Sequence, residues 1–484
     1  MLINEKFAPK TRPIKVLQFG EGNFLRCFVD WIIQNMNEAS DVDFNSNVCV
    51  VQPLAMGMID GLKKQNGLYT VLLEGLMNGK VIEENQVIDS LADFINPYSE
   101  YDRYLEYGKS ADLQYVISNT TEAGIVLDVN DTDFSKTPNS YPGKLLALLK
   151  VRYDHFNGAK DKGLDIIPCE LIDYNGDNLK KILVELAKIN NLSNDFIDWL
   201  ENSNRYYNTL VDRIVPGYPR NDAAKLAEKL GYVDNFMVKG EIFHLWVIED
   251  HHGLVNHFPA NKHLNVKFVE DVTPYKQRKV KILNGAHTLM VPVSYLAGHN
   301  TVLETMNDPL LLRFVKGFIF KEVIPTIDLP ESDMIDFANS VLERYANPFV
   351  YHELMSISLN SMTKYKTRIL DSVNTNLENN VFPKNALYSL AALIVFYRGI
   401  RNNEAIKLND NPEFLEMFKK LWSDYDQNLI SSDELVRVVL ANIEHWETDL
   451  TKEDVLTYVQ KCVKLILDEG MVNNFFKTEL NYQD

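Results

Sequence analysis

The feature that most restricts the fold of this chain is the alternation of short apolar runs with helical patterns along its first half. Residues 14–19 form an apolar run that ends at a glycine, and residues 24–33 then carry apolar side chains at helical spacing. Three more apolar runs predict further buried strands: residues 48–51, 115–118 and 164–168. Residues 140–153 predict a helix between the last two. Strands that alternate with helices indicate a parallel, doubly wound sheet, so we predict an α/β fold.

Two other patterns organise the rest of the chain. Residues 69–88, with Asn78-Gly79 near their middle, predict a hairpin added to the parallel sheet. Beyond about Lys279 apolar residues recur with a period near 3.6, which predicts a mainly α-helical C-terminal domain. The clearest such stretches are residues 310–324, 334–345, 386–401 and 455–467. From this change of period we predict a Rossmann-like domain over residues 1–278 and a helical domain over residues 279–484.

Length and charge disfavour several classes of protein. A chain of 484 residues is long enough to bury two cores. Its longest apolar stretch, near residues 387–397, is shorter than the roughly 20 residues of a membrane span, and it predicts a buried helix instead. The N-terminal residues lack the apolar core of a secretory signal, so we expect a cytoplasmic protein. The net charge of −18 disfavours nucleic acid as a partner. The sequence does not predict the oligomeric state.

The cysteines and histidines show no metal-binding pattern. The four cysteines, Cys27, Cys49, Cys169 and Cys462, lie far apart and fit neither a disulfide framework nor a zinc spacing. The ten histidines offer no H-x-x-x-H on a convincing helix, and His251-His252 precedes Gly253 in a predicted loop. We therefore expect reduced cysteines that pack in the core and no metal.

A glycine-rich turn joins the first predicted strand to the first helix. The sequence Gly20-Glu21-Gly22-Asn23-Phe24-Leu25-Arg26 stands where a dinucleotide-binding turn places its glycines against a pyrophosphate. The third glycine of that fingerprint is replaced by Leu25, and a simple tight turn explains the pattern equally well. After the second strand, Gln52 can accept hydrogen bonds from ribose hydroxyls. No arginine stands beside it to bind a 2′-phosphate, which favours NAD over NADP, although Lys63 and Lys64 leave the choice open.

Three reactive side chains fall within nine residues at the start of the predicted helical domain. On a helix, Lys279, Asn284 and His287 can converge on one small volume. A lysine ammonium can donate a proton to a forming alkoxide, an asparagine amide can donate a hydrogen bond to the same oxygen, and a histidine can hold a substrate hydroxyl. These residue types suit carbonyl reduction. Taken singly, they are also explained by a surface lysine, a capping asparagine and a buried histidine.

The spacing of these three residues resembles the K-x-x-x-x-N-x-x-H pattern of the long-chain polyol dehydrogenases, a family that includes mannitol 2-dehydrogenase and the hexuronate reductases. The stretch from Asn208 to Pro216 is similar to the V-D-R-I signature of that family with its preceding asparagine, and the glycine turn is similar to its G-x-G-x-F-x-R segment. Residues 118–124 and 169–178 also resemble the family's loop beside the nicotinamide and its asparagine-glycine segment. The resemblance spans about residues 14–370, and it is most detailed for the hexuronate reductases.

The resemblance implies a role for each matched residue. Lys279 becomes the general acid/base, Asn208 and Asn284 the donors that polarise the carbonyl, and His287 a group that orients the substrate. The cofactor NAD is expected to contact Phe19, Gly20, Gly22, Asn23, Phe24, Arg26, Gln52, Asn119, Thr120 and Glu122. Family members of this kind work without a metal. Two departures stand out, because Leu25 replaces a histidine of many polyol members and Lys276 replaces an expected acidic proton relay.

The expected reaction is the NADH-dependent reduction of the ketouronate D-tagaturonate to D-altronate. A substrate carboxylate needs a nearby cation, and Arg344 to Pro348 resembles the family's substrate-lining R-x-x-N-P segment, which includes Asn347. We favour Arg344 over Lys364 because a guanidinium binds a carboxylate through two hydrogen bonds, although a structural ion pair explains either residue as well. The alternatives are a fructuronate reductase, a mannitol-type polyol dehydrogenase, and a dinucleotide-binding sensor without catalysis. An intact Lys279 argues against the sensor.

Overall fold

The computed structural model describes residues 1–120 and 124–480. The chain forms two compact units. The first unit consists of Met1–Gly75 and Val81–Val272, and the second consists of Leu76–Lys80 and Thr273–Asp484. Each unit is described separately below.

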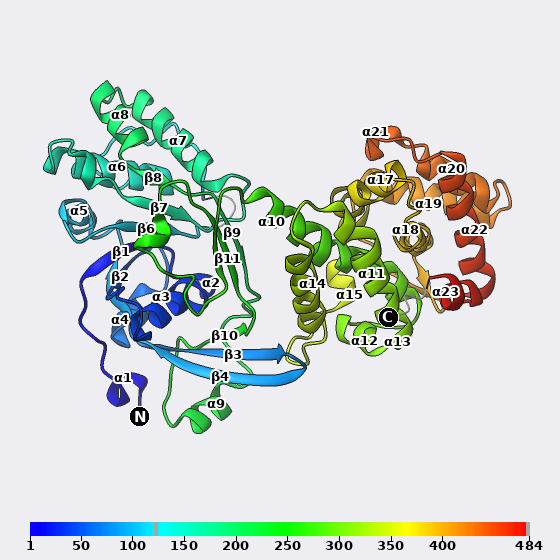
Figure 1. The fold of residues 1–484 in the computed structure, drawn as a ribbon, viewed down its shortest axis with the longest axis horizontal. Coiled ribbons are helices and arrows are strands. Elements are labelled where there is room, and N and C mark those ends of the chain that lie inside the picture. Colours follow the sequence, from blue (N-terminus) through cyan, green and yellow to red (C-terminus); the bar gives the residue numbers. More distant parts are fainter. Residues whose placement is uncertain (121–123, 481–484) are drawn as a thin grey trace. The chain divides into compact units, whose positions relative to one another are not determined.

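A six-stranded parallel sheet forms the centre of the first unit, as predicted (Figure 1). Its spatial order is β5-β2-β1-β6-β7-β8. The strands are β1 (Ile14–Phe19), β2 (Asn47–Val51), β5 (Leu91–Ile95), β6 (Tyr115–Ser118), β7 (Asp165–Pro168) and β8 (Arg205–Tyr206). Counted within this sheet alone, the order is 3-2-1-4-5-6, which is the arrangement of a Rossmann fold. Ligands of such sheets bind at the carboxyl ends of the strands, where β1 and β6 diverge to opposite sides.

Helices cover both faces of this sheet, because alternate residues of each strand point to opposite sides. Leu17 lies in a core with three helices: α6 (Tyr141–His155), α7 (Asn175–Ile189) and α8 (Asn194–Asn202). Val16, its neighbour, lies in a second core with three others: α2 (Asn23–Cys27), α3 (Val29–Glu38) and α4 (Ile59–Lys64). In Figure 1 the first three helices lie together on one side of the strands. The smaller helix α5 (Tyr101–Glu106) adds Tyr104 to the first core.

The first predicted helix is divided in two by the structure. Residues 24–33 were predicted as one helix, but Phe28 takes φ −122° and ψ −75° between α2 and α3. Phe28 is fully buried and its ring stacks on Phe24 at 5.1 Å between centroids. The interruption lets α2 follow the glycine turn at one angle and α3 cover the sheet at another.

The predicted hairpin exists, but its assignment to the parallel sheet is wrong. Strands β3 (Tyr69–Met77) and β4 (Lys80–Ile88) form a separate three-stranded sheet with β10 (Val238–Glu241). The turn residues Asn78 and Gly79 have φ of 52° and 71°, as a type I′ turn requires. Local sequence therefore specifies the hairpin, whereas its sheet partner comes from more than 150 residues further along the chain.

A third sheet completes the first unit. It joins β9 (Thr209–Asp212) antiparallel to β11 (Leu245–Glu249), which pairs in parallel with β12 (Val266–Val269). Asn208 directly precedes β9, and Glu249 ends β11. The antiparallel register therefore brings these two residues to the same end of the sheet.

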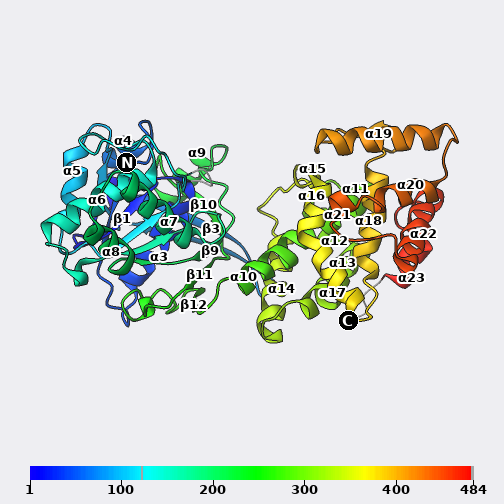
Figure 2. The same cartoon turned by 90° about the horizontal axis from the view of Figure 1, so that it is seen from above.

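The second unit is mainly helical, as predicted. The four helical stretches expected from the period correspond to α13 (Pro309–Gly317) with η5 (Phe318–Val323), α14 (Glu331–Tyr345), α18 (Lys384–Phe396) and α22 (Glu453–Glu469). The apolar stretch near residues 387–397 lies in α18, whose residues 385–396 are all buried. Figure 2 shows α18 beside α11 (Gly285–Leu296). Across the described residues, no helix has both the length and the apolar character of a bilayer span.

Within the described residues of the second unit, three π-helical segments interrupt the helices. They are η4 (Lys279–Asn284), η5, and η7 (Lys366–Leu370). Segment η4 follows α10 (Thr273–Arg278) and runs directly into α11, and η7 continues α16 (Ser361–Tyr365). The remaining helices of this unit are α12 (Val302–Asn307), α15 (Leu354–Ile357), α17 (Asp371–Glu378), α19 (Pro412–Asp426), α20 (Ser432–Leu440), α21 (Ile443–Trp446) and α23 (Asn474–Glu479). Since π-helical turns are rare and recur at functional sites, η4 and η7 direct attention to their side chains.

Candidate functional site

The glycine turn lies at the carboxyl end of β1, where a Rossmann sheet binds its ligand. Gly20 has φ of +123°, and a Cβ there would lie 2.9 Å from the carbonyl oxygen of Asn119. A side chain at this position would be strained in its backbone and would clash with the neighbouring strand. At Gly22 a Cβ would meet no atom of the described residues within 4 Å, apart from its own chain neighbours. The first glycine therefore serves the tight turn, and the second leaves open space beside the backbone where a ligand can approach.

Arg26 holds the turn together from inside. Its Nε donates to the carbonyl oxygen of Glu21 at 3.1 Å, and its Nη2 donates to Oδ1 of Asn23 at 2.7 Å. A third hydrogen bond runs from Nη1 to the carbonyl oxygen of Phe236. Arg26 is 2% exposed, and burial lowers the pKa of its guanidinium. These contacts show that the Arg26 guanidinium binds the protein's own atoms and stabilises the turn.

The two aromatic residues expected at the turn point into the protein. The ring of Phe19 packs against Tyr104 and Tyr141 in the core, with centroids 6.1 and 4.7 Å away. Its carbonyl oxygen accepts a hydrogen bond from the backbone nitrogen of Asn119 at 3.1 Å. Phe24 is half-buried and stacks on Phe28. Phe19 can thus present only its backbone to a cofactor.

The loop after β6 is tied to a buried carboxylate that follows β7. The backbone nitrogen and hydroxyl of Thr120 both donate to Oε1 of Glu170 at 2.9 Å, and Ser118 donates to Oε2 at 3.0 Å. Asn119 donates from Nδ2 to the carbonyl oxygen of Cys169 at 2.8 Å. Burial raises the pKa of Glu170. Glu122, also expected in this loop, lies outside the described residues.

Gln52 directly follows β2, as the sequence indicates. It is 2% exposed, and its Nε2 donates to the carbonyl oxygens of Leu54 and Ala55 at 2.8 and 3.2 Å. With both amide hydrogens used, Gln52 offers its Oε1 as an acceptor. A Cβ at Gly57 would come within 2.4 Å of that oxygen, so the segment after β2 folds closely over it.

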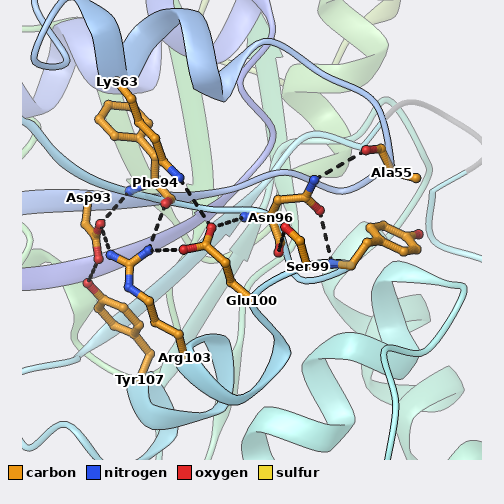
Figure 3. Close-up of polar contacts among 10 residues, drawn as sticks. Ala55, Lys63, Asp93, Phe94, Asn96, Ser99, Glu100, Arg103 and Tyr107 are labelled. Carbon is orange, nitrogen blue, oxygen red and sulfur yellow. Dashed lines mark hydrogen bonds and ion pairs between the residues drawn. The ribbon is translucent and has the colours of Figure 1, made fainter.

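Lys63 and Arg103, near this strand end, pair with carboxylates (Figure 3). Lys63 lies 3.3 Å from Oε2 of Glu100, and Arg103 lies 2.8 Å from Oε1 of the same side chain. Arg103 also pairs with Asp93, which accepts a further hydrogen bond from Tyr107 at 2.6 Å. Two positive and two negative charges therefore balance in this cluster.

The asparagine-glycine segment at the start of α7 positions Asn208. Oδ1 of Asn175 accepts a hydrogen bond from the backbone nitrogen of Thr209 at 2.9 Å, and its Nδ2 donates to the carbonyl oxygen of Pro168 at 3.0 Å. A Cβ at Gly176 would lie 2.4 Å from the carbonyl oxygen of Tyr207. The glycine therefore allows α7 to approach the segment that carries Asn208.

Two carboxylates hold the side chain of Asn208. Its Nδ2 donates to Oδ2 of Asp177 at 3.0 Å and to Oε1 of Glu249 at 3.1 Å. Its Oδ1 accepts from the backbone nitrogen of Asp177 at 3.1 Å. Glu249 also accepts from the backbone nitrogen of Val272 at 3.1 Å and lies 3.5 Å from Nε2 of His251. The orientation of the Asn208 amide is thereby fixed.

The π-helical segment η4 brings Lys279 and Asn284 together on one face. In a π-helix the backbone bonds join residues five apart, so this pair is about one turn apart. In an α-helix the same pair would be turned by about 140°. His287, three residues beyond Asn284, lies on the adjoining face of α11. Within the described part of the chain, no hydrogen bond involves the half-buried side-chain amide of Asn284.

His287 is buried among aromatic rings and cations. Its ring lies 4.3 Å from that of Tyr345 and 5.0 Å from that of His352, between centroids. Burial, and then the charges of His352, Arg344, Arg368 and Lys364, lower the pKa of His287 well below its ordinary value. The ring is therefore neutral at physiological pH. Its Nε2 is buried and has no hydrogen-bond partner among the described residues.

The three residues expected to bind substrate all belong to the second unit. Arg344 is 9% exposed at the end of α14. Asn347 caps the turn that follows, because its Oδ1 accepts a hydrogen bond from the backbone nitrogen of Phe349 at 3.0 Å. Lys364 donates from Nζ to the carbonyl oxygen of Ile357 at 2.8 Å, and burial lowers the pKa of this lysine.

Sequence reasoning missed several polar residues of these sites. Glu170 follows a strand of the parallel sheet, and a search of strand ends for polar residues would have found it. Glu249 and His352 carry no such signal, because their neighbours Asn208 and His287 come from distant parts of the sequence. Over the described residues there is no group of three or more potential metal ligands, and all four cysteines are buried and unpaired.

The chain matches two family models and many curated proteins. The mannitol dehydrogenase Rossmann domain matches residues 14–262, and the mannitol dehydrogenase C-terminal domain matches residues 271–466. Altronate oxidoreductase of Escherichia coli strain 536 is 46% identical over 463 residues, which cover 95% of each chain. Altronate oxidoreductase of Shigella flexneri is 45% identical over the same shares.

Solved structures share the fold at lower identity. A substrate-free D-sorbitol dehydrogenase has a TM-score of 0.81 and 21% identity, with 95% of this chain and 94% of that chain covered. Pseudomonas fluorescens mannitol 2-dehydrogenase, in a ternary complex with NAD and D-mannitol, has a TM-score of 0.66 and 22% identity, with 96% and 94% covered.

Proposed function

The chain belongs to the mannitol dehydrogenase family, and from this premise we propose that it catalyses the reversible NADH-dependent reduction of D-tagaturonate to D-altronate. It is an oxidoreductase that acts on CH–OH groups, and its Rossmann domain takes a nicotinamide cofactor. The relatives named altronate oxidoreductase match nearly the whole chain, which favours a sugar acid over a neutral polyol as the substrate.

The observation that carries the proposal is the arrangement of Lys279, Asn284 and His287 on one helix. The π-helical turn sets the lysine and the asparagine on one face, and the buried Nε2 of the neutral His287 has no hydrogen-bond partner in the described part of the chain. A nicotinamide cofactor, when bound, would supply the hydride. Lys279 then donates the proton that the forming alkoxide needs, and the amide of Asn284 donates a hydrogen bond to the same oxygen.

His287 contributes to orientation rather than to proton transfer in this scheme. A histidine whose pKa lies far below its ordinary value does not carry a proton at physiological pH, so its Nε2 is suited to a hydrogen bond with a substrate hydroxyl. We propose the role of second carbonyl donor for Asn208, although both hydrogens of its amide bind carboxylates in this structure.

The glycine turn and the side chain of Gln52 both suit the binding of NAD. The open space beside Gly22 accommodates a pyrophosphate, and Oε1 of Gln52 is an acceptor for ribose hydroxyls. A 2′-phosphate would need an unpaired cation, but Lys63 and Arg103 both pair with Glu100. Lys64 is exposed and lies on the same helix. We therefore propose NAD rather than NADP as the cofactor.

The proposal is tested by the absorbance of NADH with purified protein and a panel of ketoacids and ketoses. We expect the highest kcat/KM with D-tagaturonate, and oxidation of D-altronate by NAD in the reverse direction. Preference for D-fructuronate or D-fructose would assign the chain to another branch of the family. Absence of turnover with every substrate, from protein that binds NADH, would indicate a sensor.

A further inference from the structure

The second unit contains a cluster of positive side chains around His287. Arg344, Lys364 and Arg368 all act on the pKa of this histidine through their charges, as does His352. They come from two parts of the sequence: Arg344 from the end of α14, and Lys364 and Arg368 from the continuous segment formed by α16 and η7. The charges of three basic side chains therefore act on one buried, neutral imidazole.

Arg368 reaches this cluster through a close approach of η7 to α11. A Cβ at Gly285 would lie 3.3 Å from the carbonyl oxygen of Arg368, so a glycine at this position allows the two helices to pack closely. Nη1 of Arg368 donates to the hydroxyl of Thr288 at 3.2 Å, and that hydroxyl donates to the carbonyl oxygen of Asn284 at 3.0 Å. The guanidinium is therefore anchored beside the residues that follow Asn284.

Arg368 and Lys364 lack the carboxylate partners that their neighbours have. Lys366 lies 2.8 Å from Oε1 of Glu447, and Lys281 lies 2.7 Å from Oδ2 of Asp371. In the parts of the chain that the structure describes, no ion pair joins a carboxylate to Arg368 or Lys364. Arg368 makes one side-chain hydrogen bond, to Thr288, and Lys364 makes one, to a backbone carbonyl.

Burial makes these two charges costly without an anion. It lowers the pKa of Arg368 and of Lys364, and for Lys364 the charge of Arg368 lowers it further. An anion that binds between two half-buried positive charges stabilises both of them. The charge of Asp410 raises the pKa of Lys364, but the carboxylate of Asp410 accepts its hydrogen bonds from Tyr397 and two backbone nitrogens.

From this arrangement we propose that Arg368 and Lys364 bind the carboxylate of a sugar-acid substrate. The guanidinium supplies two parallel donors for the carboxylate, and the lysine adds a point charge. Sequence reasoning favoured Arg344 for this task; we place Arg368 there because, among the described residues, no ion pair joins it to a carboxylate and its guanidinium is anchored beside Thr288. The inference rests on the proposed function and adds to it the residues that distinguish a ketouronate from a neutral ketose.

The test compares D-tagaturonate with D-tagatose, in which a hydroxymethyl group replaces the carboxylate. In R368Q and K364Q we expect the ratio of kcat/KM for D-tagaturonate to that for D-tagatose to fall about 10- to 100-fold, as for loss of a charged hydrogen bond. R368K retains the charge and should lose less. K366Q is the matched control, since Lys366 lies between the two residues in sequence but pairs with Glu447. NADH binding and Tm are measured for each variant.

Direct binding separates failure of this inference from failure of the proposed function. Calorimetric titration of D-altronate should show weaker binding to R368Q and K364Q than to the wild type and K366Q. If no ketouronate is reduced but D-altronate binds more weakly to R368Q and K364Q, the anion site is supported and the proposed reaction is contradicted. If the wild type reduces D-tagaturonate while both variants keep the wild-type ratio and D-altronate affinity, the carboxylate binds elsewhere, and a changed ratio in R344Q would assign it to Arg344.

Discussion

The side-chain amide of Asn208 donates a hydrogen bond to the carboxylate of Glu249, with Nδ2 and Oε1 3.1 Å apart. Because the other amide hydrogen is bound by Asp177, Asn208 can donate to a substrate carbonyl only if one carboxylate gives way. Asn284 has no such competitor among the described residues. The two proposed carbonyl donors therefore differ. The amide of Asn208 is already bound to two carboxylates, whereas the amide of Asn284 has no hydrogen bond within the described residues.

We predict that N208A and N284A each reduce kcat more than they raise KM. A preorganised donor acts mainly on the charge that develops in the transition state, and removal of one typically costs about 10²- to 10³-fold in kcat. Steady-state kinetics with NADH and the preferred ketouronate measure both parameters. N202A is the control, since Asn202 ends α8 and its side-chain amide donates to Asp198. A rise in KM alone in both test variants would make these asparagines ordinary binding residues.

We predict that K279M lowers kcat by about 10²- to 10⁴-fold, because general acid catalysis contributes that much, while NADH binding changes little. K281M is the matched control, because Lys281 belongs to the same π-helical turn but pairs with Asp371 and donates to the carbonyl oxygen of Thr326 at 3.2 Å. Turnover and fluorescence titration of NADH are measured for both variants. If K279M retained more than about a tenth of wild-type turnover, Lys279 would have no part in proton transfer.

We predict a preference for NADH over NADPH that narrows in E100Q. Removal of the Glu100 charge releases Lys63 and leaves Arg103 with Asp93 alone, so a 2′-phosphate meets a free cation. The ion pairs are partly exposed, and each is worth about 0.2 to 1 kcal/mol, so the ratio of catalytic efficiencies should shift by about two- to five-fold toward NADPH. The double variant E100Q/K63M should return the ratio toward the wild-type value. An unchanged ratio in E100Q would place the discrimination elsewhere.

The fold could be predicted where the information is local. The strand at residues 14–19 is apolar and ends at a glycine, and the dipeptide Asn78-Gly79 strongly favours a tight turn. The sheet that contains the hairpin could not be predicted, because β3 pairs with β10 across a large separation in sequence. The break at Phe28 also escaped prediction, since an apolar residue at helical spacing says nothing about its φ and ψ.

The candidate site also combines features that local sequence predicts with features that depend on contacts between distant residues. Lys279, Asn284 and His287 stand close in sequence and could be recognised by their spacing, but the π-helical turn that sets two of them on one face is not visible in a hydrophobic period. The sequence predicted that Arg26 belongs to the glycine turn, but not that it binds backbone carbonyl groups, because these groups become its neighbours only in the fold. The surroundings of Arg368, anchored on Thr288, depend likewise on tertiary contacts that no motif encodes.

The last prediction concerns a buried carboxyl group beneath the glycine turn. Oδ2 of Asp30 accepts hydrogen bonds from Tyr69 at 3.1 Å and from Gln18 at 3.5 Å, and Gln18 in turn donates to the carbonyl oxygen of Gly20. Asp30 is fully buried, Oδ1 has no partner among the described residues, and burial raises the pKa of this carboxyl group to about 7. The hydrogen bonds and the charge of Arg26 oppose the rise without cancelling it.

A raised pKa in the folded state makes the protonated carboxyl group the stabilising form. Its contribution to the free energy of unfolding is fully present below the unfolded pKa, near 3.8, and is lost as pH rises through about 7. Between pH 6 and pH 8.5 this loss amounts to about 1.4 kcal/mol. D30N cannot ionise, so its stability should change less over that interval by this amount. Urea unfolding of both proteins, followed by tryptophan fluorescence at the two pH values, measures the difference. Equal changes in the wild type and D30N would mean that Asp30 is already ionised at pH 6, with its charge compensated by Arg26.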